Sequence, residues 1–159
     1  MSTLTENKKA RFDYDILETL EAGLVLRGHE VKSVKSGRAK IQGAYAIIRG
    51  EEIYLVGMHI PPYQQANTTS DYDPDRTRKL LLSKKEIIHL AGKTGEKGLT
   101  LVPLSVYTNH GLVKVLLGLG RGKKQVDKRQ TIKAREAQRH VERIISAKDP
   151  LRLRQPAER

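Results

Sequence analysis

The chain has 159 residues and a formal net charge of +12, and 38% of its residues are hydrophobic while 4% are aromatic. It contains no cysteine, which excludes a disulfide framework and a cysteine-based zinc site, and no apolar run approaches the ~18 residues of a membrane-spanning helix. We therefore expect a cytoplasmic protein that has one domain, a mainly aliphatic core and polyanionic partners.

The positive charge is concentrated near the C-terminus. Residues 121–154 contain twelve Lys/Arg and four Asp/Glu, a net of +8, whereas the first 120 residues contain 17 basic and 13 acidic residues, a net of +4. We therefore divide the chain into a body, residues 1–120, and a basic tail, residues 121–159. The free tail is expected to be disordered, because its like charges repel and its apolar residues are too few for a core. Its spacing permits a helix once phosphates neutralise it, and a purely solubilising tail is the alternative.

The N-terminal part of the body begins with seven polar residues, which we expect to be mobile. Residues 14–26 start with helical spacing and continue with strand-like alternation, and we favour a strand. Residues 28–37 are bracketed by glycines, and the three-residue spacing of Val31 and Val34 predicts a short helix. Such a helix would direct Glu30 and Lys32 toward solvent or a partner.

Two pairs of apolar segments, each joined by a turn-rich link, predict β-hairpins. The first pair is 44–48 and 53–60, and the second is 99–107 and 112–119. Alternation predicts that four side chains share a face in the last strand of each hairpin. These are Tyr54, Val56, Met58 and Ile60 in the first hairpin, and Val113, Val115, Leu117 and Leu119 in the second, with Lys114 on the opposite face.

The segment between the hairpins is expected to hold a surface loop, a strand and a helix. Residues 63–78 are polar and contain proline, which is typical of a loop, and residues 79–82 suit a short strand. Ser83 followed by Glu86 forms the sequence of a capping box, which predicts that a helix begins there. We expect this helix to face the core with Ile87, Ile88 and Leu90.

Many short strands, one or two short helices and antiparallel connections predict a mainly β fold. Closing the sheet would remove its exposed edges, so we expect an OB-like small antiparallel β-barrel with embedded short helices. An open α+β sandwich is the alternative.

Motifs for nucleotide or metal binding are incomplete. The glycine-rich segment 117–124 fails both the Walker A and the GxGxxG patterns, and we expect a flexible exit from the last strand. Asp71, Asp73 and Asp75 alternate as in a calcium loop, but the required Gly and Glu positions hold Arg76 and Leu82. The five histidines lie far apart in sequence. We therefore predict no catalytic residue, no metal and no cofactor.

Several long blocks carry a specific resemblance. In order they are NKKARFDY, LEAGLVLRGHEVKSVKSGRA, RTRKLLLSKKEI, GLTLVPLSVY, KVLLGLGRGKK and DKRQTIKAR, between Asn7 and Arg135. They resemble the SsrA-binding (SmpB) family, whose members bind transfer-messenger RNA. The resemblance implies an OB-like barrel and a non-enzymatic, monomeric factor for trans-translation.

The family's role sets the expected partners. It implies binding to the tRNA-like domain of transfer-messenger RNA, and delivery to stalled ribosomes with elongation factor Tu and GTP. The tail is implied to meet 16S rRNA at the decoding centre, to enter the empty mRNA channel as a helix, and so to permit tagging of the nascent chain. A general basic binder of ribosomal or nucleoid nucleic acid, with no membrane partner, is the alternative.

The resemblance also assigns residues. In the body, the RNA contacts implied by the family are Glu21 and the run Leu81, Leu82 and Ser83, where many members carry Asn at the last position. We add four cations as contacts to RNA phosphates: Lys8, Lys9, Arg11 and Lys32.

In the tail, two motifs are implied to act on the ribosome. These are Gly122, Lys123 and Lys124, followed by Asp127, Lys128 and Arg129. The family usually has His or Tyr before the second motif, where this chain has Val126, which offers apolar contact but no ring for stacking.

Overall fold

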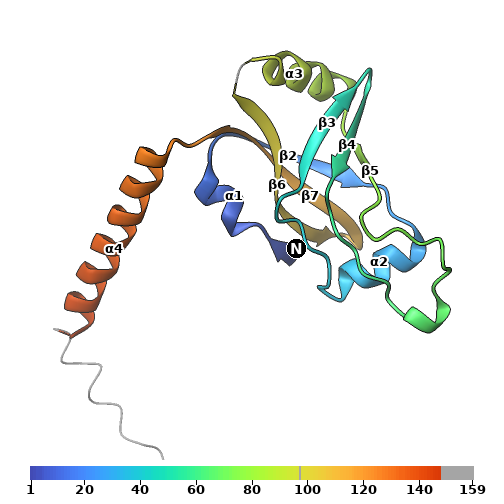
Figure 1. Cartoon of the computed structure of the whole chain (residues 1–159), viewed down its shortest axis with the longest axis horizontal. Helices are drawn as coiled ribbons and strands as arrows, with labels where there is room; N and C mark the ends of the chain where they lie inside the picture. Colours follow the sequence, from blue (N-terminus) through green and yellow to red (C-terminus); the bar gives the residue numbers. More distant parts are fainter. Residues whose placement is uncertain (97, 148–159) are drawn as a thin grey trace, which may run out of the picture. The chain divides into compact units, whose positions relative to one another are not determined.

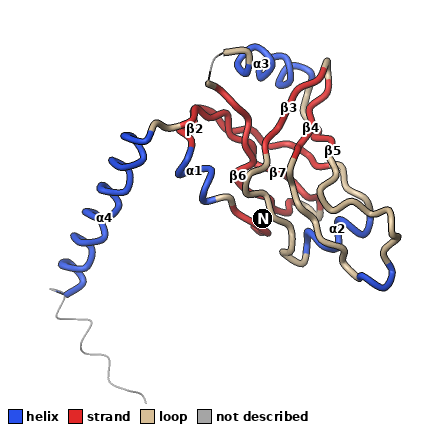
Figure 2. Tube along the Cα trace, in the orientation of Figure 1, coloured by secondary structure: helices blue, strands red, loops and turns tan. Residues whose placement is uncertain are grey.

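The computed structural model describes residues 1–96 and 98–147 (Figure 1). Within these residues, strands and short helices alternate along the chain, and Figure 2 distinguishes them by colour. The elements are β1 (Ser2–Glu6), α1 (Lys8–Asp13), β2 (Tyr14–Leu24), α2 (Gly28–Lys35), β3 (Tyr45–Arg49), β4 (Glu52–Val56), η1 (Gln65–Asn67), β5 (Arg78–Leu81), α3 (Lys84–Thr94), β6 (Leu99–Asn109), β7 (Leu112–Gly122) and α4 (Gln125–Ala147).

The sheet is antiparallel and closes on itself. Its strand order is β1-β6-β3-β4-β5-β2-β7, and β6 also pairs with β7. The six strands from β6 to β7 therefore form a ring, and β1 is added to the outside edge of β6. The mainly β fold with embedded short helices is confirmed, and the ring of pairings agrees with the expected small barrel rather than with an open sandwich.

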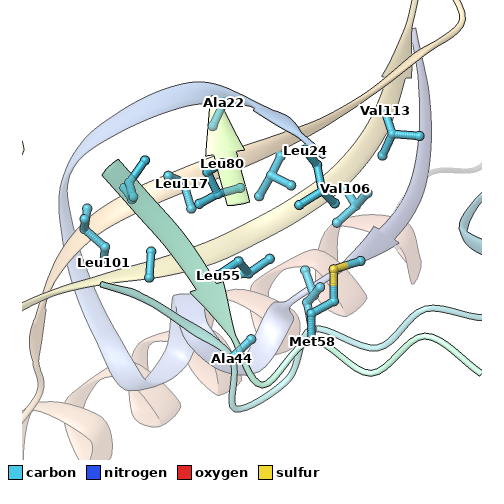
Figure 3. Close-up of a cluster of buried hydrophobic side chains, with 14 of the residues drawn as sticks. Ala22, Leu24, Ala44, Leu55, Met58, Leu80, Leu101, Val106, Val113 and Leu117 are labelled. Carbon is cyan, nitrogen blue, oxygen red and sulfur yellow. The ribbon is translucent and has the colours of Figure 1, made fainter. Parts of the chain in front are cut away.

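The core fills the inside of this ring. Figure 3 shows side chains from several strands converging there, among them Leu55, Leu80, Leu101 and Leu117. In β7, alternate residues from Val113 to Leu119 are buried, which confirms the face predicted for that strand. The core is aliphatic because the chain has one Phe and no Trp to place in it.

The hairpin of β3 and β4 confirms one prediction and corrects another. Its register pairs Tyr45 with Val56, as a tight antiparallel hairpin requires. The predicted common face is wrong, because Tyr54 and Val56 are part-exposed whereas Met58 and Ile60 are buried. Gly57 lies between them with φ of +85°, a conformation that glycine adopts without strain, and it reverses the phase of the alternation.

The N-terminal segment is ordered, contrary to the expectation of a mobile start. β1 pairs with β6 from Thr108 to Ser105. Asn7 is buried, and its side-chain amide donates hydrogen bonds to the carbonyls of Pro103 (3.0 Å) and Ile41 (3.3 Å). Its Oδ1 accepts from the amide of Ala10 and so begins α1. A polar sequence is compatible with this strand because its side chains remain largely exposed.

Helix α3 begins with the predicted capping box, since Ser83 Oγ accepts from the Glu86 amide and Glu86 accepts from the Ser83 amide. Ile87 and Leu90, three positions apart, face the core as expected. The prediction for Ile88 is wrong, because this side chain is 70% exposed. A helix turns about 100° per residue, so Ile88 cannot share the buried face of Ile87.

The end of β7 replaces the expected flexible exit. Gly118 and Gly120 are buried inside this strand, beneath a small second core formed around Ala10, Val102 and Leu104. A Cβ on Gly118 would lie 2.9 Å from Leu104 Cδ1, and one on Gly120 would lie 3.0 Å from Tyr14 Cβ. These glycines therefore let side chains of β6 and β2 pack closely against β7.

The chain divides into two compact units, Met1–Gly122 and a second that begins at Lys123. The described part of the second unit is α4, in which none of the residues is buried. The free tail is expected to be disordered and to become helical only once phosphates neutralise it, whereas the structure has a helix over Gln125–Ala147. Residues 148–159 of the predicted tail lie outside the described residues. Across residues 1–96 and 98–147, no helix is long and apolar enough to cross a membrane.

Candidate nucleic-acid interface

A buried ion-pair cluster fixes β5 against α2. Glu30 is fully buried, contrary to the expectation that it faces solvent or a partner. Its carboxylate accepts from Arg78 Nε (2.8 Å), from Arg76 Nη2 (2.5 Å) and from the Arg27 amide (2.9 Å). Burial raises the pKa of Glu30, but the hydrogen bonds from Arg27, Arg76 and Arg78 outweigh it and the net pKa is lowered. The spacing of Val31 and Val34 predicts a helix, but it gives no sign that Glu30 pairs with arginines 46 and 48 residues later in the chain.

β5 pairs with β2, and β2 pairs in turn with β7. Gly23 of β2 lies between two partners, Leu81 of β5 and Lys114 of β7. A Cβ at Gly23 would be 3.1 Å from Leu81 Cβ, so the glycine leaves room for the leucine. Directly paired residues project to the same face of the sheet. Leu81 and Lys114 therefore lie on either side of Gly23, which has no side chain to fill the space between them.

We name the resulting surface the Glu21 face, defined by Glu21, Gly23, Leu81, Leu112 and Lys114. Leu81 is 54% exposed and Leu112 is 62% exposed, and both line a shallow groove together with Lys114. Two large aliphatic side chains exposed beside a cation form a surface that suits the sugar and base edges of a polyanion.

The carboxylate of Glu21 is held in place at one oxygen. The hydroxyl of Tyr107 donates a hydrogen bond to Glu21 Oε2, and Lys114 Nζ lies 3.9 Å from Oε1. Desolvation of the buried phenol, followed by this hydrogen bond, raises the pKa of Tyr107 to about 12, so the phenol stays a donor at neutral pH. The carboxylate is still 44% exposed and retains lone pairs that can accept from a base or ribose.

Ser83 stands two residues after Leu81 at the start of α3. Its oxygen accepts from the Glu86 amide at 3.3 Å, so the hydroxyl hydrogen can point outward as a donor. Leu82, also implied by the resemblance, is half-buried and packs against the core. Of Leu81, Leu82 and Ser83, the structure thus leaves Leu81 and Ser83 available to a partner.

The predicted phosphate contacts do not all lie with Glu21. Lys32 is exposed on α2, next to Val31, which lines the groove of the Glu21 face. Lys8, Lys9 and Arg11 are exposed on α1, where Lys9 instead lines a separate hollow together with Tyr14 and Tyr45.

The tail residues form the start of α4. Gly122 ends β7, and Asp127 accepts from the Lys124 amide (3.4 Å) and carries negative charge in the first helical turn. This position favours helix formation, because the first turn bears exposed N–H groups and the positive end of the helix dipole. Val126 is 61% exposed and Arg129 is exposed, while Lys128 is half-buried.

Sequence reasoning had not assigned Tyr107, Leu112 or Lys114 to a site. Tyr107 is 86 residues from Glu21, and that distance hides their hydrogen bond. Lys114 carried a usable signal, since it is the one charged residue in the apolar segment 112–119.

Comparison with known proteins identifies the family of the chain. The family model described as SmpB protein matches residues 4–147. An SsrA-binding protein of Synechococcus elongatus is 50% identical over 145 residues, covering 91% of this chain and 94% of the relative. One from Pelotomaculum thermopropionicum is 49% identical over 153 residues, covering 96% and 98%.

A solved structure described as "tmRNA-SmpB: a journey to the center of the bacterial ribosome" contains a similar chain. It has 51% identity and a TM-score of 0.64, with 76% of this chain and 85% of that chain covered. Both the family model and the relatives extend through the barrel and into α4. The chain therefore belongs to the SmpB protein family.

Proposed function

We propose that this chain binds the tRNA-like domain of transfer-messenger RNA and, through its tail, acts on stalled ribosomes in trans-translation. The observation that carries the proposal is the Glu21 face, where an oriented carboxylate adjoins an exposed Leu81 and a lysine. The name SsrA-binding protein among its relatives supports the same RNA.

The contacts have distinct roles in this proposal. Glu21 accepts hydrogen bonds from a base or ribose, Ser83 donates one, and Leu81 covers an apolar base or sugar edge. Lys114 and Lys32 pair with phosphates, which adds affinity but little selectivity. Lys8, Lys9 and Arg11 add phosphate contacts away from this face.

The tail acts after the RNA is bound. Gly122, Lys123 and Lys124, and then Asp127, Lys128 and Arg129, meet 16S rRNA at the decoding centre, with Val126 in apolar contact rather than stacking. The rest of α4 lies in the empty mRNA channel. The protein acts as a monomer without catalysis, and elongation factor Tu with GTP joins the delivery complex.

A binding assay with matched leucine variants tests the body's role. L81A should weaken binding to transfer-messenger RNA about tenfold, since a buried Leu contact is worth about 1.5–3 kcal/mol. L17A is the control, because Leu17 of β2 is also 54% exposed but lies four residues from Glu21 along the strand. An elongator tRNA serves as the competitor RNA.

The alternative is a general binder of ribosomal or nucleoid nucleic acid. It predicts equal affinity for both RNAs and equal effects of L81A and L17A. If five phosphates are neutralised, the slope of log K against log salt is roughly −4 for either model, so selectivity and not the slope decides. Equal binding of both RNAs would overturn the proposal.

A further inference from the structure

Another hollow, of about 500 Å³, lies on the outer side of the β3–β4 hairpin, apart from the groove of the Glu21 face and the hollow beside Lys9. It is lined by Tyr45, Ile47, Arg49, Tyr54, Val56 and Thr77. We name this surface the hairpin face. In the strand order β6-β3-β4-β5-β2-β7, β3 is three strands from β2, and β4 is two strands from it with β5 between them. The hairpin face therefore lies on other strands than Glu21, although Leu81 of the Glu21 face is on β5, which pairs with β4.

The register of the hairpin makes this face. Tyr45 pairs with Val56 and Ile47 pairs with Tyr54, so the four side chains form a block of two cross-strand pairs. Directly opposed side chains have Cβ atoms about 5 Å apart. The intervening Ala46, Ile53 and Leu55 point into the core and are buried, so the block must face outward.

The negative charge of Glu52, beside the hairpin face, is neutralised by a neighbouring lysine. Glu52 accepts a hydrogen bond from the Tyr54 hydroxyl and one from Lys79 Nζ at 2.9 Å. The hydrogen bond to Glu52 also raises the pKa of Tyr54. Because Lys79 neutralises Glu52, the guanidinium of Arg49 adds net positive charge to the hollow that Tyr45 and Tyr54 line. The hydrogen bond to Glu52 also fixes the hydroxyl end of the Tyr54 ring.

The hairpin face continues toward a basic helix. Tyr45, which is 45% exposed, also borders the hollow that contains Tyr14 and Lys9 of α1. Three of the chain's six tyrosines thus line adjoining hollows with a cation at each end, Arg49 and Lys9. Aromatic rings that alternate with cations along a barrel face are suited to binding unpaired nucleotides. The bases stack on the rings, and the phosphates pair with the cations.

We infer that the hairpin face is a second RNA-binding surface, which takes the unpaired bases of a single-stranded RNA segment on Tyr45 and Tyr54. Arg49 pairs with a phosphate of that segment, and Lys9 pairs with another beyond Tyr45. Since β3 and β4 carry none of the residues that define the Glu21 face, the hairpin face is a separate surface from the site proposed for the tRNA-like domain.

Tyrosine-ring NMR on the full-length protein tests this inference. The probes are an eight-nucleotide oligoadenylate, a length within the range that one OB-type barrel covers, and an abasic ribose-phosphate chain of the same length. Raised salt suppresses binding through the basic tail. Ring resonances of Tyr45 and Tyr54 should shift with oligoadenylate and not with the abasic chain, while Tyr63, in the loop after β4, should not respond.

Leucine variants supply the energetic test. Y45L and Y54L keep apolar bulk but remove the ring, and each should weaken oligoadenylate binding roughly tenfold, whereas Y45F should bind like the natural chain. Y63L is the matched control, since Tyr63 is 39% exposed and has the Arg38 guanidinium 6.0 Å from its ring centroid. L112A alters the Glu21 face on β7, a strand that does not pair with β3 or β4, and should leave the ring shifts unchanged. This separates the test from that of the Glu21 face.

Three results would overturn the inference. The first is unchanged ring resonances at saturating oligoadenylate, and the second is an equal response to the abasic chain. The third is full RNA binding by both Y45L and Y54L, which would assign the hairpin face to an apolar protein partner instead.

Discussion

Glu30 and Glu21 are both hydrogen-bonded carboxylates, but they lie in opposite environments. Glu30 is fully buried among Arg76, Arg78 and the Arg27 amide, so it connects α2 to β5. Glu21 is half-exposed, and its partner Tyr107 leaves part of the carboxylate available. Burial and partner geometry, rather than residue type, thus separate a stabilising residue from a candidate contact residue.

Replacing Glu30 by Gln should lower the free energy of unfolding by about 3–5 kcal/mol, because it leaves the charge of the buried Arg78 uncompensated. Urea unfolding at neutral pH measures this change. E51Q is the control, because the Glu51–Lys84 pair is exposed and 3.7 Å apart, and such pairs contribute about 0–1 kcal/mol. Equal, small effects of E30Q and E51Q would contradict the role of the cluster.

The same carboxylate predicts a dependence on acid. The pKa of Glu30 in the folded protein is below 4.5, the ordinary value for glutamate, so its stabilisation is fully present above about that pH. It is lost as the pH falls through the lowered pKa. Unfolding experiments between pH 5 and pH 2 should therefore show a steeper loss of stability in the natural chain than in E30Q, and parallel curves would contradict this.

Tyr107 predicts a dependence on alkali. Its pKa is about 12 in the folded protein against the ordinary 10.0 of tyrosine, so its contribution to stability is present below about pH 10 and lost between pH 10 and 12. The ultraviolet titration of Y107F should lack the phenol that ionises near pH 12. E21Q should move that phenol to lower pH, while a Tyr107 that titrates with the exposed tyrosines would contradict the contact.

At the scale of elements, the glycines of β7 are a packing feature rather than a phosphate loop. G118A places a Cβ against Leu104 and Ile16 and should destabilise the protein by about 1–3 kcal/mol in thermal or urea unfolding. G122A is the control, because nothing lies within 4 Å of its Cβ, and it should change stability by less than about 0.5 kcal/mol. Adding L104A to G118A should recover part of the loss, and additive losses would contradict this contact.

Local patterns predicted most elements but not their long-range partners. Alternation found β7 and its buried face, and the Ser83–Glu86 spacing found the start of α3. The buried position of Glu30 could not be read locally, because its arginine partners come from a distant segment. The face of β4 was misassigned because one positive-φ glycine reverses the alternation without changing its apparent period.

The candidate site followed the same division. The resemblance supplied Glu21, Leu81 and Ser83, and the register brings Glu21 and Leu81 to one face around Gly23. Lys9 was grouped with them by charge alone, and charge carries no information about position. The structure instead puts Lys9 beside Tyr14 and Tyr45.

Helix α4 should add helicity but little stability to the body, because none of its residues is buried. Truncation after Gly122 should reduce the circular dichroism signal at 222 nm and leave the cooperative unfolding midpoint of the barrel nearly unchanged. A large fall in that midpoint would show that the barrel depends on the tail. Truncation after Gly120 is unsuitable, since it removes the last two residues of β7.

At the scale of the whole molecule, the barrel and the tail have different chemical resources. The barrel has a small net charge but presents two shaped surfaces on different strands, whereas the tail carries most of the net positive charge. Selective RNA recognition is therefore expected from the barrel, because phosphate contacts alone give affinity without selectivity. The tail's charge is expected to act on ribosomal RNA.

Comparing RNA binding with tagging activity tests this division most directly. The full chain, a truncation after Gly122 and a variant with the tail from Lys123 scrambled at constant composition are measured for affinity to transfer-messenger RNA. The same three proteins are then assayed for tagging of a nascent chain on ribosomes stalled at an mRNA end. We predict that all three bind the RNA, and that the full chain alone supports tagging. Tagging by the scrambled tail, or loss of RNA binding on truncation, would contradict the account.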